Sequence, residues 1–260
     1  MSQKFLTLSS RIWFGVAATG QLAFVLFIFI YYGSRTLRGD FAAWNNKPVI
    51  TGFVPGDTLG NLLFAVHVLL GGVITLVGLL QVVTYTRQLA PGLHRWNGRL
   101  FLALGVFLAI DGVWKILYRG STLSGASTLG GLLGAAVILL CCALAFYCAR
   151  QHRVAAHRRW ALRAFLVVNG VWFFRVGLMA WIIINQGPLG MNATLSGPAD
   201  VALAFSSYLL PLACLELYFW AQSSASARIK YLAGGIILLT TLLMAVGIVG
   251  TVLMLWWPYI

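Results

Sequence analysis

Charged residues are scarce in this sequence. Only 9% of its 260 residues are Asp, Glu, Lys or Arg, whereas an ordinary soluble domain carries roughly 25%. Apolar residues make up 60%, and the mean hydropathy is +0.89. Such a chain cannot cover its apolar residues with a polar surface. The composition therefore argues against a disordered protein, a nucleic-acid-binding domain and a cytosolic Rossmann enzyme.

Acidic residues are the rarest charged class, with 5 against 18 Lys and Arg and a net charge of +13. The basic residues lie mostly in short connections between apolar runs, where they orient membrane proteins, so we expect no nucleic-acid partner. Cysteine is also sparse, and the sequence has no CxxCH motif for haem attachment. All four cysteines fall within apolar runs, where we expect them to be small buried hydrophobic residues: Cys141, Cys142, Cys148 and Cys214.

Long apolar runs dominate the rest of the chain. A transmembrane helix needs about 20 apolar residues. Seven segments qualify, at about 11–33, 58–83, 96–117, 129–149, 160–186, 201–222 and 231–255. They are too long and continuous for the alternating strands of a membrane barrel. We predict an all-α polytopic membrane helix bundle in three parts: 1–57 with the first helix and a long connection, 58–190 with four helices that carry the histidines, and 191–260 with two final helices.

The distribution of Lys and Arg predicts the orientation. Twelve lie on one set of connections and five, Lys115 among them, on the opposite set, while Arg175 lies inside a segment. The positive-inside rule then places the N-terminus in the cytoplasm and the C-terminus outside, with Trp256, Trp257 and Tyr259 as an aromatic anchor at the outer interface. Compact connections of this kind suit a bacterial inner membrane, so the lipid bilayer is the first expected partner.

Ionisable residues inside the apolar segments are few, and each is a functional hypothesis because such groups are costly in a bilayer. They are His67, Asp111, Arg175 and Glu216. Helix rise places Asp111 and Arg175 at similar depth, not far from His67. We therefore expect an Asp111–Arg175 pair, direct or bridged by a ligand, with His67 in the same catalytic site. A purely structural ion pair is the alternative.

The segment 58–83 has a polar and glycine-rich face. At 100° per residue one line runs through His67, Gly71, Gly78, Gln81 and Tyr85. The two glycines leave a groove that a flat ligand could approach. Tight helix packing around a hydrogen-bonded histidine is the alternative interpretation.

Two segments begin with similar motifs. One starts His94-Arg95-Trp96-Asn97-Gly98-Arg99 and the other His157-Arg158-Arg159-Trp160-Ala161-Leu162-Arg163. Both histidines would lie at the same end of outward-running helices. Interfacial Trp and lipid-bound Arg explain part of the pattern, but two equivalent histidines less well. In a straight helix His157 and Arg175, 18 residues apart, would share a face.

The motifs as a group resemble a family of membrane proteins known as domain-of-unknown-function family 2306. The resemblance covers roughly residues 55–190 and rests on this run: His67-x3-Gly71-x6-Gly78-x2-Gln81, then His94-Arg95-x2-Gly98-Arg99 and His157-Arg158.

A more distant likeness is to diheme transmembrane reductases of the cytochrome b561 type. In that family the second and fourth helices hold an outer haem, and the third and fifth an inner haem. Here His67 matches the second position, His94 the third and His157 the fifth, while the fourth segment has no histidine. The resemblance implies that His94 and His157 are the ligands of one b-type haem and that His67 is free for a substrate or quinone. His152, in a connection, is the alternative to His157.

We interpret the chain as an integral membrane redox protein, a transmembrane oxidoreductase with haem b, or quinone-linked electron transfer, or both. His67, Asp111 and Arg175 form its expected catalytic site. The expected cofactor-binding residues are His94, His157, Gly71, Gly78, Gln81, Arg95 and Arg99, with His94 and His157 on the metal. Expected partners are a quinone or small redox molecule, a redox partner protein or a second copy. The alternatives are a haem-free transporter or small-ligand-binding protein that uses the same polar site, a haem-free enzyme with a histidine-bound metal, and a structural subunit.

Overall fold

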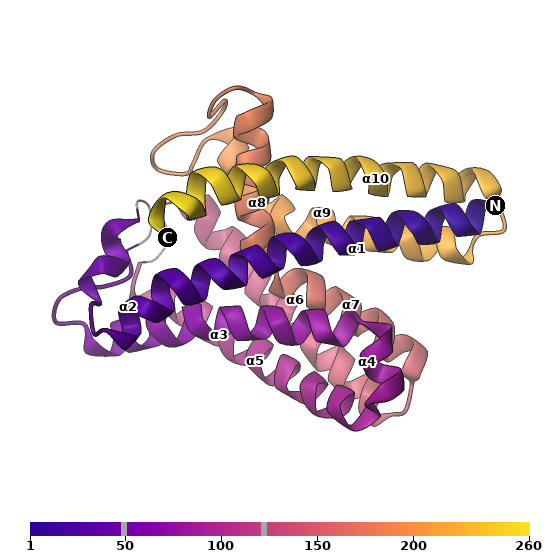
Figure 1. The fold of residues 1–260 in the computed structure, drawn as a ribbon, viewed down its shortest axis with the longest axis horizontal. Helices are drawn as coiled ribbons and strands as arrows, with labels where there is room; N and C mark the ends of the chain where they lie inside the picture. The colour runs from indigo at the N-terminus through magenta and orange to yellow at the C-terminus, as the bar shows by residue number, and fades with distance from the viewer. Residues whose placement is uncertain (48–50, 121–123) are drawn as a thin grey trace.

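The structure, a computed structural model, describes residues 1–47, 51–120 and 124–260. Throughout these residues the regular structure is helical, without strands, which confirms the predicted all-α membrane bundle (Figure 1). Six helical stretches are long and apolar enough to cross a membrane. They are α1 (Ser2–Phe27) with η1 (Ile28–Gly33) and α2 (Ser34–Leu37); α3 (Thr58–Val82); α5 (Pro91–Tyr118); α6 (Gly125–Arg150); α9 (Pro198–Ser223); and α10 (Ala227–Gly250) with η3 (Thr251–Trp256) and η4 (Trp257–Tyr259).

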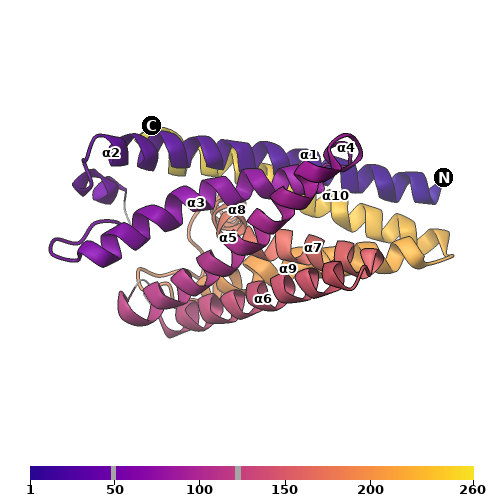
Figure 2. The ribbon, with the colours of Figure 1, turned by 90° about the horizontal axis from the view of Figure 1, so that it is seen from below.

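The seventh predicted segment is broken. Helix α7 (Val154–Val168) and helix α8 (Gly170–Ile184) meet at Asn169 with a bend of 55°. The buried Asn169 donates from Nδ2 to the carbonyl of Phe165 at 2.8 Å, and Gly170, a weak helix former, follows it. Figure 2 views α8 nearly end-on, while α1 and α10 run along the bundle.

The bent pair still passes from one end of the bundle to the other. Ser124, which caps the start of α6, donates from Oγ to the carbonyl of Leu195 at 2.8 Å. The α8–α9 connection therefore lies beside the start of α6. The two termini lie at opposite ends of the long axis (Figure 1), as an odd number of crossings requires. Counted as one span, α7 and α8 make the seventh crossing that the sequence predicts.

The helices pack in two groups. Helices α3, α5, α6 and α7 pack against one another in sequence order, and α1, α8 and α10 form the second group. Helix α9 contacts α6 and α7 on one side and α8 and α10 on the other. In both views α1 and α10, from the two ends of the chain, lie side by side (Figures 1 and 2).

Small residues allow these helices to approach closely. A Cβ on Gly20 of α1 would lie 2.6 Å from Ile248 of α10 and 2.7 Å from Trp172 of α8. Gly130 and Gly134 of α6 face Ala204 and Tyr208 of α9, where an added Cβ would lie at 3.2 and 3.5 Å. The GxxxG spacing of these two glycines therefore serves close helix packing, as such motifs do in membranes.

Arg119 fastens the long connection after α1 to the end of α5. Its guanidinium donates to the carbonyls of Gly60 (2.9 Å) and Gly52 (3.0 Å) and to Oδ1 of Asn61 (2.7 Å), and pairs with Asp57 at 3.2 Å. Asp57 also caps α3 by accepting from the amide of Gly60 at 2.8 Å. One cation thus fixes the end of α5 to the start of α3.

Two local expectations were wrong. Helix α3 ends at Val82, and Tyr85 lies in the short helix α4 (Thr84–Leu89), so Tyr85 is not on the face of His67. Trp256 is only 2% exposed and stacks on Phe24 and Phe27, so it belongs to the core rather than to an interfacial anchor; Trp257 is exposed.

Candidate functional site

A cavity of about 690 Å³ opens at the end of the bundle that carries the N-terminus, between α3, α5, α6 and α7. Its volume lies within the range of about 300–1,000 Å³ that is typical of ligand pockets. We call it the histidine cavity because His94, His152 and His157 all line it. Among the described residues five arginines line it as well, and no carboxylate does: Arg87, Arg95, Arg99, Arg150 and Arg158.

His94 lies in the first turn of α5, which begins at Pro91. The Nε2 of Gln81 donates to the backbone carbonyl of His94 at 2.8 Å and so ties the end of α3 to this turn. Gly98 makes room for that amide, since a Cβ there would lie 3.2 Å from Gln81. The Nδ1 atom of His94 is buried and has no hydrogen-bond partner among the described residues. Gln81 therefore positions His94 and also lines the cavity.

His157 lies in the first turn of α7, and its ring contacts α6. The Nδ1 atom is 2.9 Å from the carbonyl of Ala145, which can only accept. Nδ1 therefore carries a proton, and in the neutral imidazole Nε2 has a lone pair. Metal-binding histidines are held in this way, with the second ring nitrogen donating to a carbonyl or carboxylate. The structure thus brings the two histidines to one cavity.

The two similar motifs have similar local structures. The guanidinium of Arg99 lies 4.8 Å from the ring centre of Trp96, and that of Arg163 lies 4.4 Å from Trp160. Arg163 differs in also forming a two-pronged pair with Glu216 of α9, at 2.7 and 2.9 Å. Glu216, singled out in the sequence as an intramembrane acid, therefore joins α9 to α7.

The glycines of α3 do not share one role. A Cβ on Gly78 would lie 3.0 Å from Phe101 and 3.1 Å from Phe165, so these rings fill the groove expected there. Gly78 still borders the histidine cavity. A Cβ on Gly71 would meet no atom of the described residues within 4 Å, so the space beside Gly71 is open.

His152 lines the cavity from the connection between α6 and α7. Its φ of 55° is left-handed, as is common for the residue that ends a helix. The amide of Arg153 donates to the carbonyl of Cys148 at 2.9 Å and closes this turn. The position of His152 is therefore fixed by the backbone turn at the end of α6, whereas the ring of His157 is fixed by its hydrogen bond to α6.

A cluster of buried charges lies toward the other end of α3 and α5. Asp111 Oδ2 accepts from His67 Nδ1 at 2.5 Å and from Lys115 Nζ at 3.0 Å. The side chain of Asp111 is 3% exposed, that of Lys115 11% and that of His67 29%. The second carboxylate oxygen of Asp111 is buried without a partner among the described residues. We call His67, Asp111 and Lys115 the carboxylate cluster.

The direct Asp111–Arg175 pair is not present among the described residues, and a pair bridged by a ligand stays a prediction. Arg175 Nη1 donates to the carbonyl of Val171, one turn back on α8, at 3.0 Å, and its guanidinium lies 5.5 Å from the ring centre of Phe24. The bend at Asn169 is the reason, because α8 no longer continues the direction of α7. For the same reason His157 and Arg175 do not share a face of one straight helix.

Lys115 is the partner that the sequence analysis missed. It was counted with an external connection, but it lies inside α5 and is buried. Residues four apart on a helix are neighbours, so the spacing of Asp111 and Lys115 was a sufficient signal for this pair.

Lys47, in the connection before α3, is a second buried cation near this end. It is 5% exposed, and its Nζ lies 4.8 Å from the ring centre of Phe27. Burial, aided by the charge of Arg175, lowers the pKa of Lys47 from 10.5 to about 7. No signal along the chain predicts this burial.

Comparison with known proteins identifies the family. No curated protein and no solved structure matches the chain. Among the described residues no group of three or more His, Cys, Asp and Glu could hold a metal ion. A family model described as "Predicted membrane protein (DUF2306)" matches residues 64–203, which contain both the histidine cavity's paired histidines and the carboxylate cluster. The chain belongs to this family of membrane proteins.

Proposed function

We propose that the protein is an integral membrane redox protein in which His94 and His157 hold a b-type haem in the histidine cavity. The observation that carries the proposal is that these two histidines, 63 positions apart in the printed sequence, line one cavity of about 690 Å³. A haem supplies one-electron transfer, and its ligands and surroundings set the potential.

The donor set fits such a group. The Nδ1 of His157 is committed to Ala145, which leaves Nε2 as a ligand atom. The Nδ1 of His94 is buried without a partner among the described residues, and Gln81 donates to the backbone carbonyl of His94. Two imidazoles are sufficient because a porphyrin supplies the other ligands of its iron.

The charge of the cavity also supports the proposal. Five arginines line it without a carboxylate, so an anionic ligand would relieve their mutual repulsion. A b-type haem carries two propionates, and guanidinium groups bind carboxylates with paired hydrogen bonds. Arg95 and Arg99, on successive turns of α5, are our first candidates for this contact.

The carboxylate cluster has a separate part in the proposal. Asp111 holds the Nδ1 proton of His67, which leaves Nε2 of this partly exposed ring free to accept or donate a proton. Lys115 Nζ lies 3.0 Å from the same carboxylate and pairs with it. We propose that His67 exchanges protons with a substrate or quinone. Arg175 is not a member of this cluster, and we assign it no part in this exchange.

Optical spectroscopy tests the haem. The purified full chain should show a Soret band and a reduced-minus-oxidised difference spectrum, which His94→Ala and His157→Ala should each abolish. His152→Ala is the matched comparison, because this histidine lines the same cavity without a held ring, and it should keep the spectrum. Colourless protein that stays colourless after haem is supplied during expression would overturn the proposal.

A haem-free small-ligand-binding or transport function is the second candidate. The buried, unpartnered Oδ1 of Asp111 favours it, because such an oxygen suits a ligand that donates a hydrogen bond. It would be preferred if the protein is colourless and Asp111→Asn abolishes ligand uptake or binding.

We also propose a bacterial inner membrane with the N-terminus in the cytoplasm, from the distribution of basic residues. A reporter enzyme fused after Ile260 should be active outside the cytoplasm. Activity of a cytoplasmic reporter at that position would reverse the orientation.

A further inference from the structure

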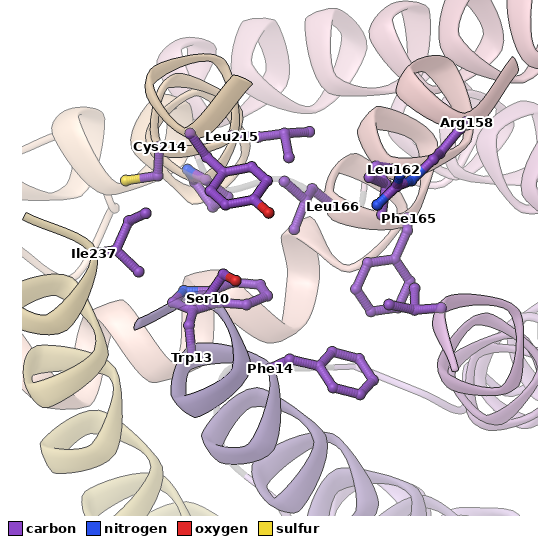
Figure 3. Close-up of a pocket in the computed structure, with 13 residues that line it drawn as sticks. Ser10, Trp13, Phe14, Arg158, Leu162, Phe165, Leu166, Cys214, Leu215 and Ile237 are labelled. Carbon is purple, nitrogen blue, oxygen red and sulfur yellow. The ribbon is translucent and has the colours of Figure 1, made fainter. Parts of the chain in front are cut away.

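A second cavity, of about 200 Å³, lies beside the histidine cavity, between α1, α7, α9 and α10 (Figure 3). In the close-up, Trp13 and Phe14 of α1 lie across the cavity from Cys214 and Leu215 of α9. Ile237 of α10 closes one side, and residues of α7 close the other. This small cavity therefore joins the N-terminal helix and the last two helices to the histidine-bearing group.

The two cavities share a wall. Val82, Arg158, Leu162 and Phe165 line both of them. A molecule in the small cavity would therefore be separated from the histidine cavity by a single layer of side chains. Short separation of this kind suits exchange of electrons between two bound groups.

The lining of the small cavity is apolar with a few hydrogen-bond donors. Trp13 and Arg158 line the cavity, and an indole N–H and a guanidinium can donate but not accept. Ser10 also lines it, and its hydroxyl donates to the carbonyl of Thr7 at 2.8 Å. Tyr218 accepts from Gln222 at 3.4 Å, so its own hydroxyl proton is available to donate. Within the part of the chain that the structure describes, no carboxylate lines the cavity. Its complement is an apolar molecule that carries hydrogen-bond acceptors and no cation.

The size of the cavity narrows the ligand class further. About 200 Å³ is below the range of about 300–1,000 Å³ that encloses a drug-sized molecule, so only a single ring fits. A bare acyl chain would fill such a space without using its donors. A ring with carbonyl acceptors and a lipid-soluble tail uses both the apolar wall and the donors.

We propose that this small cavity binds the ring of a lipid-soluble quinone. The binding itself stands on the shape and lining of the cavity; its part in electron transfer rests on the proposed function, because the haem would lie behind the shared wall. The site is separate from the carboxylate cluster, where His67 is proposed to exchange protons with a substrate or quinone. It also assigns a role to α1, α9 and α10, which the histidine motifs leave without one.

Decylubiquinone, a short-chain benzoquinone, is the probe. Its retention by the immobilised full chain in detergent is measured at increasing concentration and compared with empty micelles. We expect saturable binding of one molecule per chain. Non-saturable uptake equal to that of empty micelles would overturn the proposal.

Two variants locate the site. Ile237→Phe fills the cavity with a larger side chain and should weaken binding at least tenfold. Leu239→Phe is the matched control, because Leu239 lies two residues along α10 with 59% of its surface exposed, and it should bind like the original protein. Equal binding by both variants would contradict the site even if the quinone binds elsewhere.

Removal of one donor tests the chemistry without adding volume. Tyr218→Phe keeps the ring and loses the hydroxyl, so binding should weaken about threefold to tenfold, the range of a single net hydrogen bond. Decylbenzene, which has the same chain but no carbonyl, should not compete. Full competition by decylbenzene would show a site for a hydrocarbon chain and overturn the quinone assignment.

The haem spectrum of the same preparations keeps this test separate from that of the proposed function. Saturable quinone binding by colourless protein would leave the cavity assignment intact and remove the haem. A normal haem spectrum without quinone binding would support the haem and overturn the assignment of the small cavity.

Discussion

The two ends of the α3–α5 helix pair differ in the arrangement of their charged side chains. In the carboxylate cluster one buried acid contacts two bases at 2.5 and 3.0 Å, so charges are paired inside the protein. Five arginines line the histidine cavity, a space of about 690 Å³ that no carboxylate of the described residues lines. Paired buried charges connect helices, whereas several cations around one cavity favour the binding of an anionic ligand.

The comparison shows why residue type alone does not identify a site. His67 and His94 are both partly buried histidines on the α3–α5 helix pair. His67 contacts a carboxylate, whereas Nδ1 of His94 has no hydrogen-bond partner among the described residues. What each histidine can bind follows from its neighbours. The contrast can be tested in the free energy of unfolding, measured by denaturant titration in detergent.

The largest effect is expected at Asp111. Asp111→Leu leaves the ammonium of Lys115 buried without a partner and should lower the free energy of unfolding by about 3–5 kcal/mol. The double change Asp111→Leu with Lys115→Met removes both charges and should restore most of that loss. Equal losses in the single and double variants would mean that the pair does not stabilise the native protein in this way.

The second effect concerns Lys47 and depends on pH. Burial lowers its pKa from 10.5 to about 7, so between these values the unfolded chain binds a proton that the folded protein does not. The free energy of unfolding should therefore rise with pH across this window, by up to about 1.4 kcal/mol per pH unit. Lys47→Met should remove this rise and stabilise the protein most at and below pH 7. An unchanged pH dependence in the variant would assign the rise to another group.

The sequence was sufficient for the architecture because hydropathy and segment length directly encode membrane crossings. It also placed His94 and His157 at one end, since both begin helices that run the same way. Helix rise also placed Asp111 at a depth not far from that of His67, and the two side chains are in contact. These are regular properties of helices, and they survive errors of a few residues.

The bend at Asn169 explains most of what the sequence analysis missed. An Asn-Gly pair favours a turn. The side-chain amide of Asn169 donates to the carbonyl of Phe165 near the C-terminal end of α7, and side-chain bonds of this kind compete with helix continuation. A straight helix was assumed instead, which brought Arg175 to Asp111. The burial of Lys47 is different in kind, since it depends on how a connection folds onto α1, and no local pattern encodes that.

A smaller effect is expected at Gln81, which ties α3 to the backbone of His94. Gln81→Leu loses the bond of 2.8 Å and should lower the free energy of unfolding by about 0.5–1.5 kcal/mol. Asn97→Leu is the matched variant, because Asn97 donates to Val77 across the same helix pair at 2.8 Å. Both should lose similar stability, but only Gln81→Leu should alter the haem difference spectrum. The same spectral change in both variants would show that the spectrum depends on the contact between α3 and α5 and not on the position of His94.

The smallest effect is expected at Arg95, and it tests the contrast most directly. Arg95 is exposed, lines the histidine cavity and has four other arginines around the same space. Arg95→Gln should therefore change the free energy of unfolding by no more than about 0.5 kcal/mol, since the change leaves no buried charge unpaired and reduces repulsion. The same variant should bind the proposed anionic cofactor less well, so that stability and haem content separate. A loss of several kcal/mol, like that expected for Asp111→Leu, would mean that Arg95 is paired inside the protein and that the two ends do not differ as described.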